Sequence, residues 1–263
     1  MNNKMLVQKL RDNAELAWAS YGYFDLLKDN KGIPRKRYAL DKQGNKIIDN
    51  SYLRGYKEIE ITNIDILNLE LKGQEALINQ TTSNEFFPIL NKLDDTFNFD
   101  KLDGDFSPLQ AKQFFSHYDL LKHCPNTDSG FSATLFGEKR KQINSKTKEE
   151  SYTSEYGYIN YILAIRGTEI SSFKDLFVAD ASLTIGSIPK AQYDDMINFY
   201  ETCIKDYPQI KEKDSLTITG HSLGGCLAQL FALSICDDKS EANINEICNI
   251  ESKPPKGIQC CYL

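Results

Sequence analysis

Several features that mark common classes of protein are missing from this sequence. The first residues, Met1 to Gln8, lack the apolar run of a signal peptide, and no segment approaches the ~18 consecutive apolar residues of a membrane span. An excess of positive charge is also missing, because the formal net charge is −6. These absences make the cytoplasm the default localisation, with leaderless secretion left open, and they exclude broad affinity for nucleic acid.

A disulfide framework is not expected either. The seven cysteines form an odd number, include no pair with C-x-x-C spacing, and lie mostly within apolar stretches. Small buried thiols of this kind are typical of a reducing compartment.

What the sequence does contain changes in character near residue 105. Residues 1–105 combine one helical pattern near the N-terminus with short apolar runs and turn signals such as Asp103-Gly104-Asp105. This predicts a helical and irregular N-terminal region. Residues 106–263 are patterned more regularly, and we expect them to form the core of the protein.

Strand and helix patterns alternate along residues 106–263. Ser107-Pro108-Leu109-Gln110 has the residues of a helix start, and this helix is expected to run to about Leu121. The further elements predicted are strands at 131–136 and 158–165, a helix at 190–206, a strand at 215–219, a helix after Ser222 and a strand at 257–263. The charged segment 139–150 is expected to be a solvated hairpin tip. The alternation predicts an α/β fold with a mostly parallel sheet flanked by helices.

The motif that carries chemistry is Gly220-His221-Ser222-Leu223-Gly224-Gly225. It joins a predicted strand to a predicted helix, the context in which a G-x-S-x-G sequence exposes its serine on a strained turn. Gly220 and Gly224 leave room for the neighbouring backbone, and Gly225 lets the helix approach the sheet closely. Ser222 is the predicted nucleophile, and the N–H of Leu223 is a predicted donor to the oxyanion.

Together with this motif, two further runs resemble the class 3 (fungal-type) lipase family of the α/β-hydrolase superfamily. Gly130 to Phe136 reads G-F-S-A-T-L-F and Ala164 to Glu169 reads A-I-R-G-T-E, which is most similar to a bacterial branch of the family. The resemblance covers about residues 106–262. It implies an α/β-hydrolase fold and hydrolysis of an acyl ester, with triacylglycerol, phospholipid and short-chain esters all open as substrates.

The resemblance also implies roles for single residues. Thr168 would supply a second oxyanion donor, whereas Arg166, Asp175 and Asp180 would be structural. Lipid or another acyl ester is the expected partner, with peripheral contact to a membrane left open. The chemistry needs no metal or organic cofactor, so none is expected.

No residue after Ser222 fits the general base or its carboxylate. In α/β-hydrolases both follow the nucleophile, yet residues 223–263 contain no histidine, and Asp237 and Asp238 are interpreted as an exposed helix end. His221 adjoins Ser222 on the same turn, so its ring should point away from the serine.

Three interpretations stay open. In the first, the chain is a truncated lipase whose sheet is incomplete after the strand at 257–263, which predicts inactivity and self-association through an exposed sheet edge. In the second, His117 or His123 reaches Ser222 from outside the usual order. In the third, the chain is a non-catalytic binding or interaction module on a hydrolase scaffold.

Overall fold

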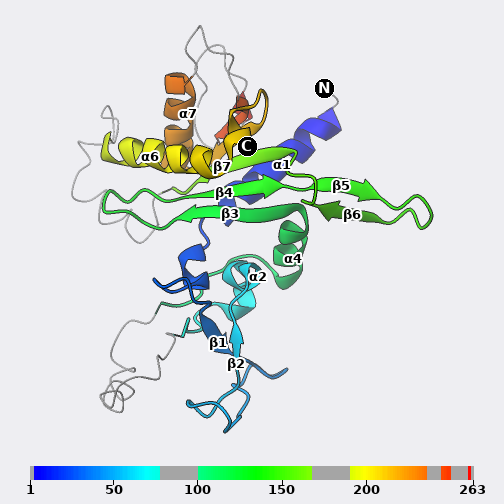
Figure 1. The fold of residues 1–263 in the computed structure, drawn as a ribbon, viewed down its shortest axis with the longest axis vertical. Helices are drawn as coiled ribbons and strands as arrows, with labels where there is room; N and C mark the ends of the chain where they lie inside the picture. The colour runs from blue at the N-terminus through cyan, green and yellow to red at the C-terminus, as the bar shows by residue number, and fades with distance from the viewer. Residues whose placement is uncertain (1–2, 78–99, 168–189, 236–243, 250–259, 262–263) are drawn as a thin grey trace. The chain divides into compact units, whose positions relative to one another are not determined.

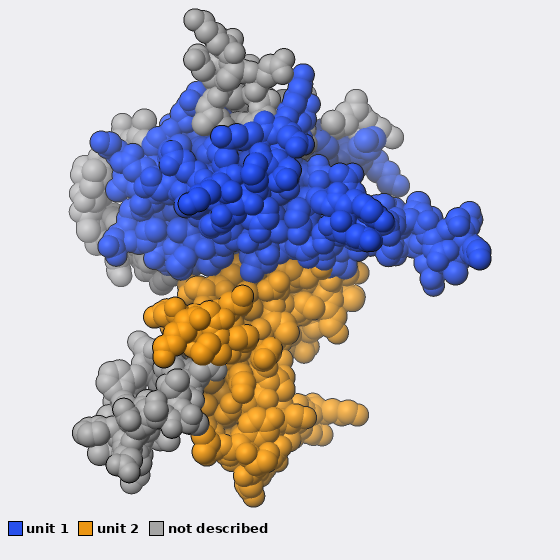
Figure 2. All heavy atoms as spheres, in the orientation of Figure 1, with its two compact units in different colours: residues 1–21, 116–263 blue, residues 22–115 orange. Residues whose placement is uncertain are grey.

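The computed structural model describes residues 3–77, 100–167, 190–235, 244–249 and 260–261, and it divides the chain into two compact units. Unit 1 contains residues 1–21 and 116–263, and unit 2 contains residues 22–115 (Figure 2). This division differs from the boundary expected near residue 105, because the N-terminal helix belongs to the unit that carries the sheet. Each unit is described separately below.

Unit 1 is built on a six-stranded sheet with the order β10-β9-β8-β7-β4-β3. Strands β7 to β10 are parallel, whereas β4 is antiparallel to both of its neighbours. The strands are β3 (Tyr118–Cys124), β4 (Ala133–Glu138), β7 (Asn160–Ile165), β8 (Leu216–Gly220), β9 (Ile244–Asn249) and β10 (Cys260–Cys261). The predicted α/β class is confirmed, with the apolar strand β7 in the interior of the sheet.

Helices cover both faces of this sheet (Figure 1). Helices α6 (Lys190–Asp206) and α7 (Leu223–Ile235) share one buried apolar cluster with alternate strand residues such as Ile218. Thr219 faces the opposite way, and its hydroxyl donates to the carbonyl of Asn13 in α1 (Asn3–Ala19), which contacts β7 and β8. Because α1 buries its apolar side on the sheet, it is an integral part of unit 1.

The helix predicted from residue 107 to about Leu121 is wrong at its end. Its start is as expected, since the Ser107 hydroxyl accepts the N–H of Gln110, but α4 (Pro108–His117) stops at His117 and strand β3 follows at once. Strand β3 pairs with β4 across six positions, with a register shift between Leu120 and Lys122. Cross-strand pairing therefore overrides the helical spacing of the apolar residues beyond His117.

The strand expected to follow the Ser222 helix is also corrected. That strand is β9, at residues 244–249, which was not predicted from the sequence. It pairs in parallel with β8. Of the strand expected at 257–263, the described part is β10, which adds to the outer side of β9. Pairing with β8 decides this order, because the polar composition of β9 has no strong strand pattern.

Two smaller features complete unit 1. Strands β5 (Arg140–Ile143) and β6 (Glu150–Thr153) form an antiparallel, largely exposed hairpin that extends from the end of β4, as predicted for the charged segment (Figure 1). A short 3-10 helix, η3 (Pro208–Lys211), precedes β8. None of the helices in the described ranges is both long and apolar enough to cross a bilayer.

Unit 2 consists of short elements joined by turns. They are η1 (Phe24–Leu27), β1 (Lys36–Tyr38), β2 (Glu58–Glu60), α2 (Asn63–Leu67), η2 (Leu69–Leu71) and most of α4. Helix α2 begins with a capping box in which Thr62 and Asp65 bond to each other's backbone N–H groups. Asp65 also forms a largely buried ion pair with Arg37, at 2.7 Å, which ties α2 to strand β1.

Candidate active site

The turn between β8 and α7 contains only His221 and Ser222. Ser222 has a φ of 54°, in the left-handed region that costs a non-glycine residue about 1–2 kcal/mol. Two other non-glycine residues in the described ranges share this conformation, Lys148 and Asp214, and both lie in exposed turns. Ser222 is half-buried at a strand-to-helix junction, so its strain is held by the surrounding packing.

Glycines make this packing possible. A Cβ atom on Gly220 would lie 2.5 Å from the Gly224 carbonyl oxygen and 2.8 Å from the Gly225 nitrogen. A Cβ atom on Gly224 would clash with the Ile165 carbonyl oxygen at the end of β7. A close approach of helix and sheet is therefore observed at Gly224, while the one expected at Gly225 stays a prediction. The turn is folded tightly on itself and against strand β7.

The start of α7 presents backbone donors beside Ser222. The first four N–H groups of a helix have no helical acceptor, and Leu223 is the first residue of α7. The N–H of Gly224 donates to the His221 carbonyl at 3.0 Å, and the N–H of Cys226 donates to the Ser222 carbonyl at 3.2 Å. The N–H of Leu223 precedes these bonds, at the positive end of the helix dipole.

The A-I-R-G-T-E run ends strand β7 next to this turn. A Cβ atom on Gly167 would lie 2.5 Å from the His221 carbonyl oxygen, so the backbone after β7 passes directly beside the residue before Ser222. Thr168 lies outside the described residues, as do Glu169, Asp175 and Asp180. Arg166 is 5% exposed, and its backbone N–H donates to the Ser132 carbonyl at 3.0 Å, so the residue is held at the buried end of β7.

His221 points toward the N-terminal segment. Its Nδ1 lies 3.1 Å from the hydroxyl oxygen of Tyr21, and the two rings are in edge contact with centroids 6.2 Å apart. The guanidinium carbon of Arg166 lies 5.6 Å from the centroid of the same Tyr21 ring. Sequence reasoning missed Tyr21, because no local pattern relates it to residues so far along the chain.

The other two histidines are held elsewhere. The ring of His117 is 4.1 Å from that of Tyr152, at the end of the sheet where β3 begins. His123 lies in register with Thr219 through three successive strand pairings, about 14 Å away at the usual strand spacing. Its Nδ1 bonds to the Thr134 hydroxyl at 2.9 Å. The structure therefore does not bring either histidine to Ser222, and Asp237 and Asp238 lie outside the described residues.

Two alternative sites offer less chemistry. Desolvation raises the pKa of the Cys226 thiol, one turn after Ser222, which keeps it protonated and weakly nucleophilic.

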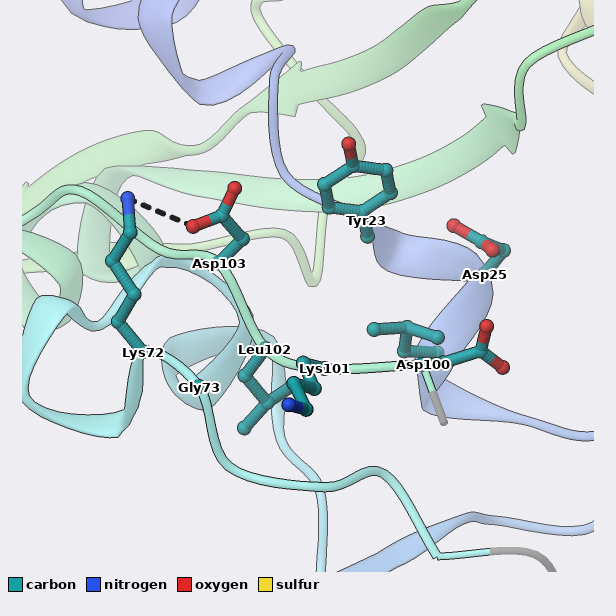
Figure 3. A pocket seen from close by; sticks show the side chains of 9 residues that line it. Tyr23, Asp25, Lys72, Gly73, Asp100, Lys101, Leu102 and Asp103 are labelled. Atoms are coloured by element: carbon teal, nitrogen blue, oxygen red, sulfur yellow. Dashed lines mark ion pairs between the residues drawn. The ribbon is translucent and has the colours of Figure 1, made fainter. Parts of the chain in front are cut away.

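A hollow of about 530 Å³ in unit 2 is lined by Tyr23, Asp25, Leu26, Lys72, Gly73 and residues 100–103 (Figure 3). Lys72 is neutralised there by Asp103 and Asp105, at 2.8 and 2.9 Å, which raise its pKa. Among the described residues that line it, none is a serine, cysteine or histidine. Among the described residues, no cluster of side chains could hold a metal ion.

Comparison with known protein families bears on the segment that contains the Ser222 turn. The family model described as Lipase (class 3) matches residues 162–250. Residues 162–250 belong to the class 3 lipase family. The resemblance to class 3 lipases is thus confirmed for this segment, and with it the α/β-hydrolase fold. No match was found among curated proteins or among solved structures.

The class 3 lipase segment contains both the A-I-R-G-T-E motif at the end of β7 and the G-H-S-L-G-G motif at the Ser222 turn. It makes this part of the chain a lipase-like hydrolase domain. Strands β3 and β4 and helix α1 lie outside the matched residues, yet they belong to the same compact unit. The helix that covers the second face of the lipase sheet therefore comes from the N-terminus of the chain.

Proposed function

We propose that this chain is a serine ester hydrolase in which Ser222 attacks the acyl carbon of a lipid or other ester. The observation that carries the proposal is the strained, half-buried conformation of Ser222 between a strand and a helix. The Ser222 oxygen would bond to the acyl carbon, and the alcohol would leave with the serine proton. Water would then release the acid from the acyl-enzyme.

Backbone donors would stabilise the negative oxygen of each tetrahedral intermediate. The N–H of Leu223 supports this role, because it opens helix α7 next to the nucleophile. The N–H of Thr168 is proposed as the second donor. Its support is the contact between Gly167 and the His221 carbonyl, which places the preceding residue beside the turn.

The rate at which Ser222 reacts depends on a general base that takes its proton. The three histidines of residues 1–263 are directed to Tyr21, Tyr152 and Thr134. We therefore expect Ser222 to react slowly in the isolated chain, and we expect added imidazole to accelerate the reaction by acting as a base from solution.

A fluorophosphonate probe tests this proposal directly, because it labels a serine only where the hydroxyl is activated. The expected result is slow labelling that rises with imidazole and is lost in Ser222→Ala. Ser234→Ala is the matched control, since Ser234 lies exposed on the same helix. Labelling that persists in Ser222→Ala would contradict the assignment of the nucleophile.

A non-catalytic binding module on the hydrolase scaffold is the second candidate. The observation that favours it is the same separation of the histidines from Ser222. In that case no labelling would occur at any imidazole concentration, while a short-chain ester would still bind and remain intact. Ester binding by calorimetry together with product analysis distinguishes the two functions.

A further inference from the structure

Three segments that are far apart in the sequence meet behind the Ser222 turn with no free space between them. A Cβ atom on Gly167 would lie 2.5 Å from the His221 carbonyl oxygen and 2.6 Å from the Tyr21 hydroxyl oxygen. The end of helix α1, the end of strand β7 and the turn after β8 are therefore in direct contact. Any shift of Tyr21 changes the space available to both of the other segments.

Tyr21 interacts with both sides of the proposed oxyanion site. Its hydroxyl is 3.1 Å from Nδ1 of His221, the residue before Ser222. Its ring lies under the guanidinium group of Arg166, with 5.6 Å between the guanidinium carbon and the ring centroid. Arg166 is two residues before the proposed donor Thr168. One side chain thus contacts both backbone segments that would have to converge on the substrate carbonyl.

His221 links the Tyr21 contact to Ser222 through the backbone of the turn. Its carbonyl accepts the N–H of Gly224, which closes the turn around Ser222 at 3.0 Å. A glycine would adopt the left-handed conformation without strain, but Ser222 carries a side chain, so contacts with its neighbours have to hold it in this conformation. A hydrogen bond that fixes the His221 side chain restricts the backbone on one side of the strained residue.

Helix α1 also has a contact with strand β8, just before the Ser222 turn. The Thr219 hydroxyl donates to the Asn13 carbonyl at 3.2 Å, and Asn13 is 5% exposed. Thr219 precedes the turn and His221 lies within it, so α1 and the residues that follow it bond to β8 and to the turn. This attachment fixes the position of the helix that precedes Tyr21, and therefore the position of Tyr21 relative to the turn.

From these contacts we infer that Tyr21 is a positioning residue, whose hydroxyl fixes His221 and thereby the reactive conformation of Ser222. The inference rests on the proposed role of Ser222. It assigns the N-terminal segment a part in the active site, although that segment lies outside the class 3 lipase match.

The test uses the full chain with Tyr21→Phe, which keeps the ring over Arg166 and removes only the hydroxyl. Tyr156→Phe is the matched control, because Tyr156 is 67% exposed. We expect Tyr21→Phe to slow fluorophosphonate labelling about fivefold, the rate equivalent of one part-buried hydrogen bond, and to lower the melting temperature only slightly. In nuclear magnetic resonance spectra we expect the ring nitrogens of His221 and the amides of residues 221–224 to shift. Tyr156→Phe should change neither measurement.

The spectra do not depend on reactivity, so they separate this inference from the proposed function. If the wild-type chain never labels, the hydrolase proposal fails and the His221 signals alone decide the role of Tyr21. Unchanged His221 signals in Tyr21→Phe overturn the inference, and so does a normal labelling rate in that variant. Should Tyr21→Phe fold poorly, His221→Phe removes the same hydrogen bond from the other side. His221→Phe alone should then slow labelling about as much as expected for Tyr21→Phe. Where Tyr21→Phe does fold, the variant that carries both changes should lose no more rate than either single variant.

Discussion

Ser222 in unit 1 and Gly44 in unit 2 both have a backbone in the left-handed region, with φ values of 54° and 86°, but their surroundings are opposite. A Cβ atom on Gly44 would meet nothing within 4 Å. Ser222 carries a side chain and is enclosed by neighbours. The conformation of Gly44 needs nothing beyond its own turn, whereas that of Ser222 depends on several segments at once.

The turn around Gly44 shows how local unit 2 is. The Asp41 carboxylate accepts the backbone N–H groups of Gln43 and Asn45, each at 2.9 Å, and the N–H of Gly44 bonds to the Asp41 carbonyl. The turn that starts at Asp29 repeats this geometry with Gly32 at the positive-φ position. Five consecutive residues are enough to build each turn.

The Ser222 turn requires contacts over much longer distances in the sequence. Its support comes from Ile165 at the end of β7 and from Tyr21, which is 200 positions away from His221. Strain at Ser222 thus coincides with non-local packing, whereas the turns of unit 2 at Gly32 and Gly44 coincide with local hydrogen bonds. The following three predictions test this contrast, from the largest expected effect to the smallest.

Adding one methyl group at a glycine should affect the two units very differently. In Gly224→Ala the new Cβ would clash with the backbone carbonyl of Ile165, which cannot rotate away, so we expect a loss of about 3 kcal/mol or more. In Gly44→Ala only the positive φ is unfavourable, at about 1 kcal/mol. Urea unfolding followed by Trp18, the only tryptophan of the chain, measures the stability of unit 1, and hydrogen exchange measures unit 2. Equal losses in the two variants would remove the contrast.

Deleting one core aromatic from each unit tests whether the units unfold separately. Phe231 is fully buried against Tyr200 in unit 1, and Phe106 is 2% exposed against Phe114 in unit 2. Each change to alanine should cost its own unit about 3–5 kcal/mol. The Trp18 transition should move in Phe231→Ala and stay at the wild-type urea concentration in Phe106→Ala. If Phe106→Ala also moves that transition, the two units form one cooperative structure.

Acid should change the stability of the two units in opposite directions through two carboxyl groups. Burial raises the pKa of Glu138 in unit 1 above 4.5, so its contribution to stability grows as the pH falls through the raised pKa toward 4.5. The N–H of Asn45, above all, lowers the pKa of Asp41 in unit 2 below 3.8, so the stability from this carboxylate is lost as the pH falls through the lowered pKa.

Neutral variants isolate these two contributions. Glu138→Gln should stabilise unit 1 at pH 7 and flatten its pH dependence between pH 7 and 4.5. Asp41→Asn should weaken unit 2 at pH 7 and leave it less sensitive to pH below 3.8. Hydrogen exchange as a function of pH measures both effects. A Glu138→Gln protein that is less stable than wild type at pH 7 would show that the charged form is the favoured one.

The comparison of sequence and structure follows the same division between local and non-local contacts. The helix predicted at 190–206 has those bounds as α6, and the G-x-S-x-G spacing predicted the strained turn at Ser222. The helix predicted to about Leu121 failed where strand pairing with β4 begins, and β9 was missed because its partner β8 decides its conformation. Elements whose conformation depends on their own residues were predicted correctly, whereas β3 and β9, whose conformation depends on pairing with another strand, were not.

The sequence by itself determined the class of fold, the family of residues 162–250 and the position of the strained turn at Ser222, because glycine spacing and apolar periodicity act over a few residues. Only the tertiary structure decided that α1 covers the second face of the sheet and that Tyr21 contacts His221 behind Ser222. It also decided that His117 and His123 lie away from Ser222. The physical reason is that such contacts depend on which strands pair and which faces are buried. A single chain fixes these features only when the whole unit has assembled.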